Sequence, residues 1–157
     1  MPILYQEKQP TYFILIVVYI IIALLLTGLI LFPTIFSQDG LSKGLKIAVL
    51  CLIIINLWLF WSFSHLTIKL TKDYLQIGFG IFKKKFKLKQ IKDCLIEDFQ
   101  KSKYSGYGIR FGVDKSIGYI ARDGQGIRIK LAMGRDYFFT TNQPGQLLQL
   151  IRQELIV

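Results

Sequence analysis

Two long apolar segments dominate the first part of the chain. The first covers positions 12–32 and contains no charged residue, and the second covers positions 47–66 with few polar interruptions. About 20 apolar residues form a helix long enough to cross the ~30 Å hydrocarbon core of a bilayer. The pattern therefore predicts a transmembrane helical hairpin, with a short connection that contains Pro33, Asp39 and Gly40.

After residue 66 the apolar period changes from a helical period to the period of two that is typical of strands. Leu75, Ile77 and Phe79 alternate with polar or small residues, and later segments alternate in the same way. The end of the chain returns to helical spacing over about 143–155, after Asn142 as a candidate cap. The pattern predicts two domains, 1–66 and 67–157. The second is an all-β bent sheet or partial barrel of about seven strands, capped by the C-terminal helix.

The charge is concentrated in this second part. The formal net charge is +10, and nearly all of it falls within residues 67–157. Many lysines follow the second predicted span, whereas the connection offers only Lys43 and Lys46. Because basic residues flank the cytoplasmic ends of spans, both termini are predicted to be cytoplasmic, in a multi-pass protein of the inner or plasma membrane. The two cysteines have no metal-binding spacing, so neither a metal site nor a cofactor is expected.

Four segments carry a resemblance to a known family. They are SGYGIR at 105–110, Gly118–Tyr119, GQGIRIKL at 124–131 and TTNQPGQLLQLI at 140–151. Following two predicted spans and a lysine-rich segment, they resemble the bacterial pleckstrin-homology-like (PH-like) domain membrane proteins. The resemblance implies a seven-stranded bent sheet closed by a helix, and a binding role rather than a reaction. Gln143 departs from the Asp that often precedes the proline, so the cap is expected from Asn142 or Thr141.

A lysine-rich stretch at residues 80–92 is the main candidate binding site. On strand periodicity Lys83, Lys85, Lys87 and Lys89 share one face, opposite Phe82, Phe86 and Leu88. Three interpretations stay open for this basic face: the solvated side of an edge strand, a contact with anionic lipid headgroups, or a contact with an acidic protein. Nucleic acid is not expected, because the run lacks interleaved aromatic platforms.

Two other polar residues attract functional interpretations. Arg110 joins the candidate basic face as an anion-binding fork, and its alternative role is to pack along the sheet. Asn56 lies in the second predicted span, where an unpaired amide is costly. It is predicted to make an intramembrane helix–helix contact, with the first helix or with a second copy of the chain.

The sequence shows no catalytic constellation. His65 is the only histidine, and no nucleophile motif or phosphate-binding loop is present. We therefore expect a protein that is not an enzyme and that docks a partner protein at the cytoplasmic membrane face. Two alternatives remain, an anionic lipid headgroup-binding module, and a small subunit of a membrane transport or assembly complex acting through Asn56 and His65. The expected partners are the membrane itself, a protein or a second copy, and anionic headgroups.

Overall fold

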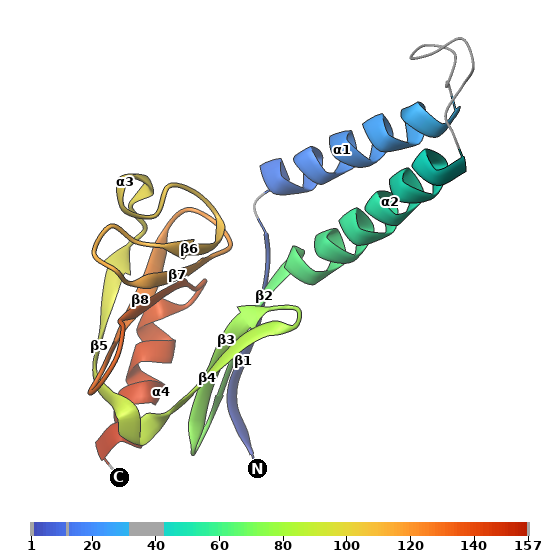
Figure 1. The fold of residues 1–157 in the computed structure, drawn as a ribbon. Coiled ribbons are helices and arrows are strands. Elements are labelled where there is room, and N and C mark those ends of the chain that lie inside the picture. Colours follow the sequence, from blue (N-terminus) through green and yellow to red (C-terminus); the bar gives the residue numbers. More distant parts are fainter. Residues whose placement is uncertain (1, 12, 32–42, 157) are drawn as a thin grey trace. The chain divides into compact units, whose positions relative to one another are not determined.

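The computed structural model describes residues 2–11, 13–31 and 43–156, and Figure 1 shows their fold. Contacts within the chain divide it into two compact units. One unit contains β1 (Ile3–Pro10) together with the chain from Phe63 onward, and the other is Phe13–Ser62. The N-terminal strand therefore belongs to the same unit as the C-terminal half of the chain.

The Phe13–Ser62 unit is built from α1 (Phe13–Leu31) and α2 (Lys43–Phe63). The two helices contact each other through Tyr19 and Phe60, whose rings meet edge to face at 6.1 Å. Large apolar side chains are exposed on both helices of this unit, among them Leu24, Leu25 and Trp61.

The prediction of two transmembrane spans is wrong. Within the described residues, no helix combines the length and the apolar character that a bilayer crossing requires. This finding also contradicts the predictions that follow from the spans: the inner-membrane location, the multi-pass topology with cytoplasmic termini, and the membrane as a partner. The hypothesis of a transport subunit loses its premise for the same reason.

The helix boundaries differ from those of the predicted spans. α1 has 19 residues, fewer than the 21 positions of the first predicted span. The second predicted span counted positions 47–66, but α2 ends at Phe63 and a strand begins at His65. At its other end, α2 starts at Lys43 and takes in both lysines assigned to the connection. Positions 33–42 of that connection, with Pro33, Asp39 and Gly40, lie outside the described residues.

The first sheet, sheet A, has the strand order β1-β2-β3-β4, and all its pairs are antiparallel. Its strands after β1 are β2 (His65–Thr71), β3 (Tyr74–Phe79) and β4 (Phe82–Lys87). The two helices thus interrupt a β1–β2 pair in the sequence, and the amide of Thr11 closes that pair by donating to the Ser64 carbonyl at 2.9 Å. Gly78 permits the close approach of β4, because a Cβ there would lie 2.3 Å from the carbonyl oxygen of Phe82.

A 3-10 turn, η2 (Leu88–Gln90), leads into the second sheet, sheet B, whose strand order is β5-β8-β9-β7-β6. Its elements, with the short helix α3, are β5 (Ile91–Asp98), α3 (Lys101–Tyr104), β6 (Gly108–Phe111), β7 (Ile117–Ile120), β8 (Gln125–Leu131) and β9 (Tyr137–Thr140). β7 and β9 pair in parallel. β8, which lies between them in the sequence, pairs with the opposite edge of β9 in the antiparallel sense.

The predicted all-β PH-like bent sheet of about seven strands is therefore also wrong. The described chain forms one four-stranded and one mixed five-stranded sheet. The added β1 comes from the N-terminal segment, and β7 and β9 pair in parallel.

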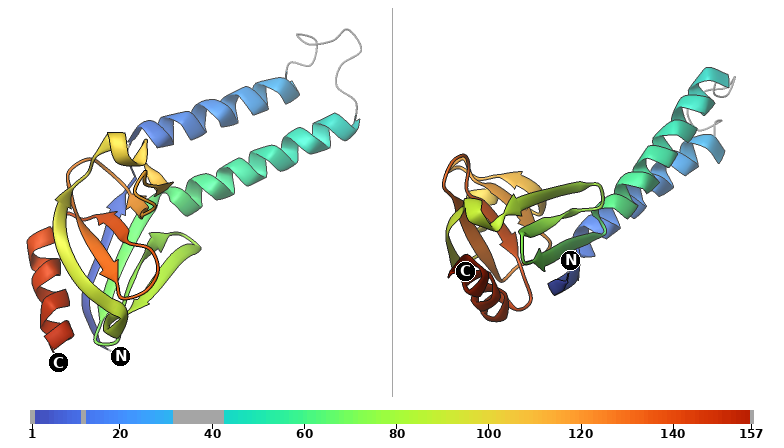
Figure 2. Two further views of the ribbon diagram at one scale, coloured as in Figure 1. Left: turned by 60° about the vertical axis from the view of Figure 1, so that its left-hand side comes forward. Right: turned by 90° about the horizontal axis from the view of Figure 1, so that it is seen from below.

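The C-terminal helix α4 (Pro144–Ile156) agrees with the predicted helix to within one residue at each end. It packs against β5, β8 and η2, as Figures 1 and 2 show. Leu147 and Ile151 on its inner side are completely buried, and they join a core that both sheets share. Sheet A therefore has one face committed to the core and the opposite face free to present polar residues.

Candidate functional site

The face of sheet A that points away from the core carries five lysines. Register partners in adjacent strands share a face, and alternate residues of one strand share a face. Ile68 of β2 and its register partner Ile77 of β3 are both buried, so they mark the side of sheet A that faces the core. The opposite side holds the set that we call the cationic face: Lys8 from β1, Lys69 from β2, and Lys83, Lys85 and Lys87 from β4.

Four lysines of the cationic face form two rows across the strands, and the fifth, Lys87, lies opposite Tyr74. Lys69 and Lys85 flank Gln76 in one row, and Lys8 and Lys83 flank the Thr67–Gly78 pair in the other. Adjacent strands lie about 4.8 Å apart, and same-face residues along a strand lie roughly 7 Å apart. In the part of the chain that the structure describes, no carboxylate occupies this face, and none of its lysines forms an ion pair.

The structure separates the four lysines that strand periodicity had placed together. Lys83, Lys85 and Lys87 lie on one side of β4, which forms an edge of sheet A. Lys89 does not join them, because β4 ends at Lys87 and Lys89 belongs to the 3-10 turn. Lys85 also places its Nζ 5.0 Å from the centre of the Tyr74 ring, a cation–π contact on the cationic face.

Arg110 lies in the other sheet. It belongs to the edge strand β6, and its Nε donates a hydrogen bond to the carbonyl of Tyr107 at 2.7 Å. Its guanidinium also packs over Gly106, whose φ of +135° favours glycine. These contacts are local to the residues that precede β6, and Arg110 does not belong to the cationic face.

The two remaining polar candidates are Asn56 in α2 and His65 at the start of β2. Asn56 is buried, and it lines a small cavity of about 90 Å³ together with Tyr19, Ile20 and Ala23 of α1. Its Oδ1 has no hydrogen-bond partner among the described residues. His65 is exposed at the start of β2, and its Nδ1 lies 2.8 Å from the Ser64 hydroxyl.

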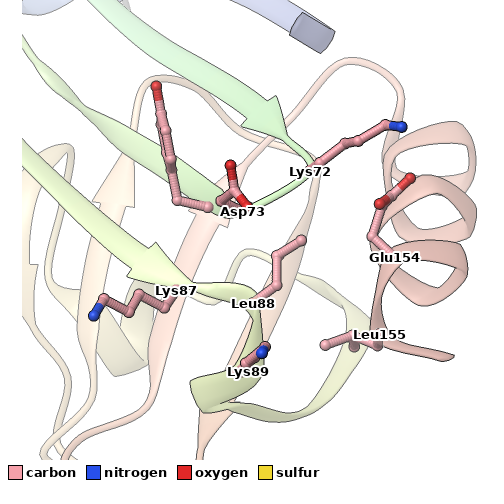
Figure 3. Close-up of a pocket in the computed structure, with 8 residues that line it drawn as sticks. Lys72, Asp73, Lys87, Leu88, Lys89, Glu154 and Leu155 are labelled. Carbon is pink, nitrogen blue, oxygen red and sulfur yellow. The ribbon is translucent and has the colours of Figure 1, made fainter. Parts of the chain in front are cut away.

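A groove opens beside the cationic face. It has a volume of about 740 Å³ and lies between the β2–β3 turn, the end of β4 with η2, and the last turn of α4 (Figure 3). Its lining residues are Lys72, Asp73, Tyr74, Lys87, Leu88, Lys89, Glu154 and Leu155. These lining segments are far apart in the sequence, and no local pattern shows that they meet.

A second feature that the sequence did not reveal joins β1 to the start of α4. The carboxylate of Glu7 accepts hydrogen bonds from Tyr5 Oη at 2.6 Å, Gln9 Nε2 at 2.9 Å, Thr141 Oγ1 at 2.6 Å and the Asn142 amide at 2.8 Å. Burial opposes the ionisation of Glu7, but these bonds outweigh it and lower its pKa. Glu7 thus fixes the strand that contributes Lys8 to the cationic face.

Sheet B holds a cluster of carboxylates that bind cations of the chain itself. Arg128 Nε lies 2.5 Å from Glu97, and Arg128 Nη2 lies 2.8 Å from Asp114. Lys103 lies 3.0 Å from each of these carboxylates. Burial opposes ionisation of both acids, but hydrogen bonds from Lys103 and Arg128 help lower the pKa of each below its usual value. The carboxylates are therefore engaged in holding β5, β8 and the β6–β7 loop together.

No family model, curated protein or solved structure matches the chain. The resemblance to PH-like domain proteins therefore stays a prediction, and the candidate site consists of the cationic face and the groove.

Proposed function

We propose that the chain is a non-catalytic binding module whose cationic face holds an acidic segment of a partner protein. One observation carries this proposal. The strand register gathers lysines from three strands, including Lys8 and Lys69 from outside the lysine-rich stretch, on a face without a described carboxylate. A face that only contacts solvent does not need positive charges without negative ones, because a mixture of both signs keeps a surface equally soluble.

The spacing of the lysines favours an extended acidic chain. Alternate side chains of an extended peptide repeat at about 7 Å, which is the repeat of lysines along β4. Gln76 and Thr67 lie between the lysines and offer neutral hydrogen-bonding groups. The lysines are spread over three strands rather than gathered around one point, an arrangement that is less suited to enclosing a single headgroup phosphate.

The expected affinity is modest and sensitive to salt. Each exposed ion pair contributes roughly 0.2–1 kcal/mol, so three lysines of β4 together account for about 1.5 kcal/mol, or roughly tenfold in Kd. Long-range attraction by the whole face also speeds association at low salt. Both effects weaken as the ionic strength rises.

The test uses the full chain and a fluorescein-labelled glutamate-rich peptide, with binding followed by fluorescence anisotropy at two salt concentrations. The variant Lys83→Gln/Lys85→Gln/Lys87→Gln is expected to bind roughly tenfold more weakly. A matched control removes three positive charges elsewhere: Lys92→Gln/Lys115→Gln/Arg122→Gln, which lie in sheet B or its turns. The control is expected to change binding less than twofold.

Two outcomes contradict the proposal. Equal binding by the wild type and the β4 variant would show that the cationic face does not recognise the peptide. Binding to phosphatidylserine vesicles that depends on the same lysines, without peptide binding, would support the headgroup alternative instead.

A further inference from the structure

The groove continues the cationic face. Tyr74 and Lys87 are register partners on the outer side of sheet A, and both also line the groove. A segment lying along β4 on the cationic face therefore reaches the groove at the Lys87 end of the strand without changing direction.

The groove differs in character from the face. Leu88 and Leu155 point into it from η2 and α4, whereas Lys87 points away from it (Figure 3). Leu155 is only partly buried, although it packs against the main core. The volume of about 740 Å³ falls within the range of cavities that enclose small ligands. Leu88 and Leu155 thus give the groove an apolar part at the end of the cationic face.

Charge sets a direction for any acidic segment bound there. Asp73 and Glu154 line the groove together with Lys72, Lys87 and Lys89, whereas the cationic face has no described carboxylate. A ligand carboxylate is therefore attracted on the β4 side of the groove and repelled directly beside these two acids. An acidic run thus fits better along β4 than in the groove, where the charges are mixed.

We propose that the groove receives a bulky apolar side chain at the end of the acidic segment. This inference rests on the proposed function and adds the sequence character of the partner: a run of acidic residues that ends in a residue such as Leu or Phe. Exposed charge pairs contribute little each, whereas one apolar anchor in a pocket commonly dominates the affinity of an interface. The anchor therefore supplies specificity that the lysines alone lack.

The experiment compares four labelled peptides on the full chain at physiological salt. Each has six glutamates: one has a C-terminal Leu, one an N-terminal Leu, one a central Leu, and one Ala at its C-terminus. We expect one of the two peptides with a terminal Leu to bind at least fivefold more tightly than the Ala peptide. The central Leu peptide is expected to gain less, because its second acidic arm meets Asp73 and Glu154.

Two groove variants and one control complete the test. Leu155→Ala and Leu155→Phe are both expected to reduce the preference for Leu over Ala to less than twofold, the first by removing a wall of the groove and the second by filling it. Leu150→Ala makes the same truncation on α4 outside the groove lining, and it is expected to keep the preference. Thermal unfolding of each variant verifies that it folds.

The outcomes separate this inference from the proposed function. If all four peptides bind equally and binding still depends on the β4 lysines, the anchor is wrong and the acidic-segment proposal survives. If no peptide binds, the proposed function itself fails. A preference for Leu that persists in both Leu155 variants would also overturn the assignment to the groove.

Discussion

Replacing Glu7 by Gln is expected to destabilise the unit that holds both sheets. The substitution keeps the shape of the side chain but replaces one carboxylate oxygen with an amide donor. Oε2 accepts hydrogen bonds from the Tyr5 and Thr141 hydroxyls, and Oε1 accepts from Gln9 and the Asn142 amide. In either orientation of the new amide, its NH₂ faces two groups that donate hydrogen bonds to Glu7 in the wild type.

The expected loss follows from these bonds. Hydrogen bonds to a charged group contribute about 1.5–3 kcal/mol each in favourable cases. Two of the four partners are hydroxyls that can rotate and accept instead, so the net loss is about 2 kcal/mol. The carboxylate also lies at the start of α4, where a negative charge is stabilised by the helix dipole. A loss of this size lowers the melting temperature by roughly 4–8 °C.

The effect of Glu7 depends on pH in a defined direction. The hydrogen bonds hold the pKa of Glu7 below its usual value despite burial. Its ionised form therefore stabilises the fold above the unfolded-state pKa, near 4.3, and this contribution is lost as the pH falls through the lower folded-state pKa. The difference in stability between wild type and Glu7→Gln is expected to be full at pH 7 and to shrink below about pH 4.

The assay is urea unfolding followed by circular dichroism at pH 7 and in steps down to pH 3. Glu154→Gln is the matched control, because it removes a carboxylate from the groove lining rather than from the β1–α4 contact. Hydrogen exchange over residues 3–10 shows whether the loss is accompanied by freeing of β1. Equal stability of the two Gln variants at pH 7 would refute this account of Glu7.

Two further predictions concern the same unit. Arg128→Met is expected to lower the free energy of unfolding in urea by about 3–5 kcal/mol, because it leaves Glu97 and Asp114 partly buried without their main cation. Adding Glu97→Gln should recover part of this loss. An Arg128→Met variant as stable as wild type would contradict the role of the cluster. Deleting residues 2–11 exposes the edge of β2 and removes the cross-strand neighbours of the buried Leu66 and Ile68. The shortened chain is expected to self-associate in size-exclusion chromatography, and an unchanged monomer with an unchanged melt would contradict this.

Local patterns in the sequence were sufficient for some elements. The alternation of Leu75, Ile77 and Phe79 marks a strand with one buried side, and β3 has that side completely buried. The apolar spacing of Leu147 and Ile151 after Pro144 marks α4. In these elements the buried residues follow the regular spacing of a strand or a helix, and this spacing can be read directly from the apolar residues in the sequence.

Other elements depend on long-range contacts that no local pattern contains. β1 carries Tyr5, Glu7 and Gln9 on its inner side, and Gln9 is completely buried. Such polar residues do not predict a strand next to a core. They are accommodated because Glu7 and Gln9 find partners at residues 140–142.

The candidate site was only partly visible for the same reason. Strand periodicity identified Lys83, Lys85 and Lys87, but it also counted Lys89, since the sequence did not show that β4 ends in a 3-10 turn. Lys8 and Lys69 became part of the site only through the register of sheet A.

These two lysines provide the most direct test of the central claim, that the site is a face and not a lysine-rich stretch. The measurement is the Kd of the full chain for the acidic peptide by anisotropy, in the variant Lys8→Gln/Lys69→Gln, with Lys92→Gln/Lys115→Gln as the charge-matched control. If the whole face binds, the first variant weakens binding by about fivefold, from two exposed pairs at roughly 0.5 kcal/mol each, and the control changes it less than twofold. Wild-type affinity in the Lys8→Gln/Lys69→Gln variant would contradict the claim.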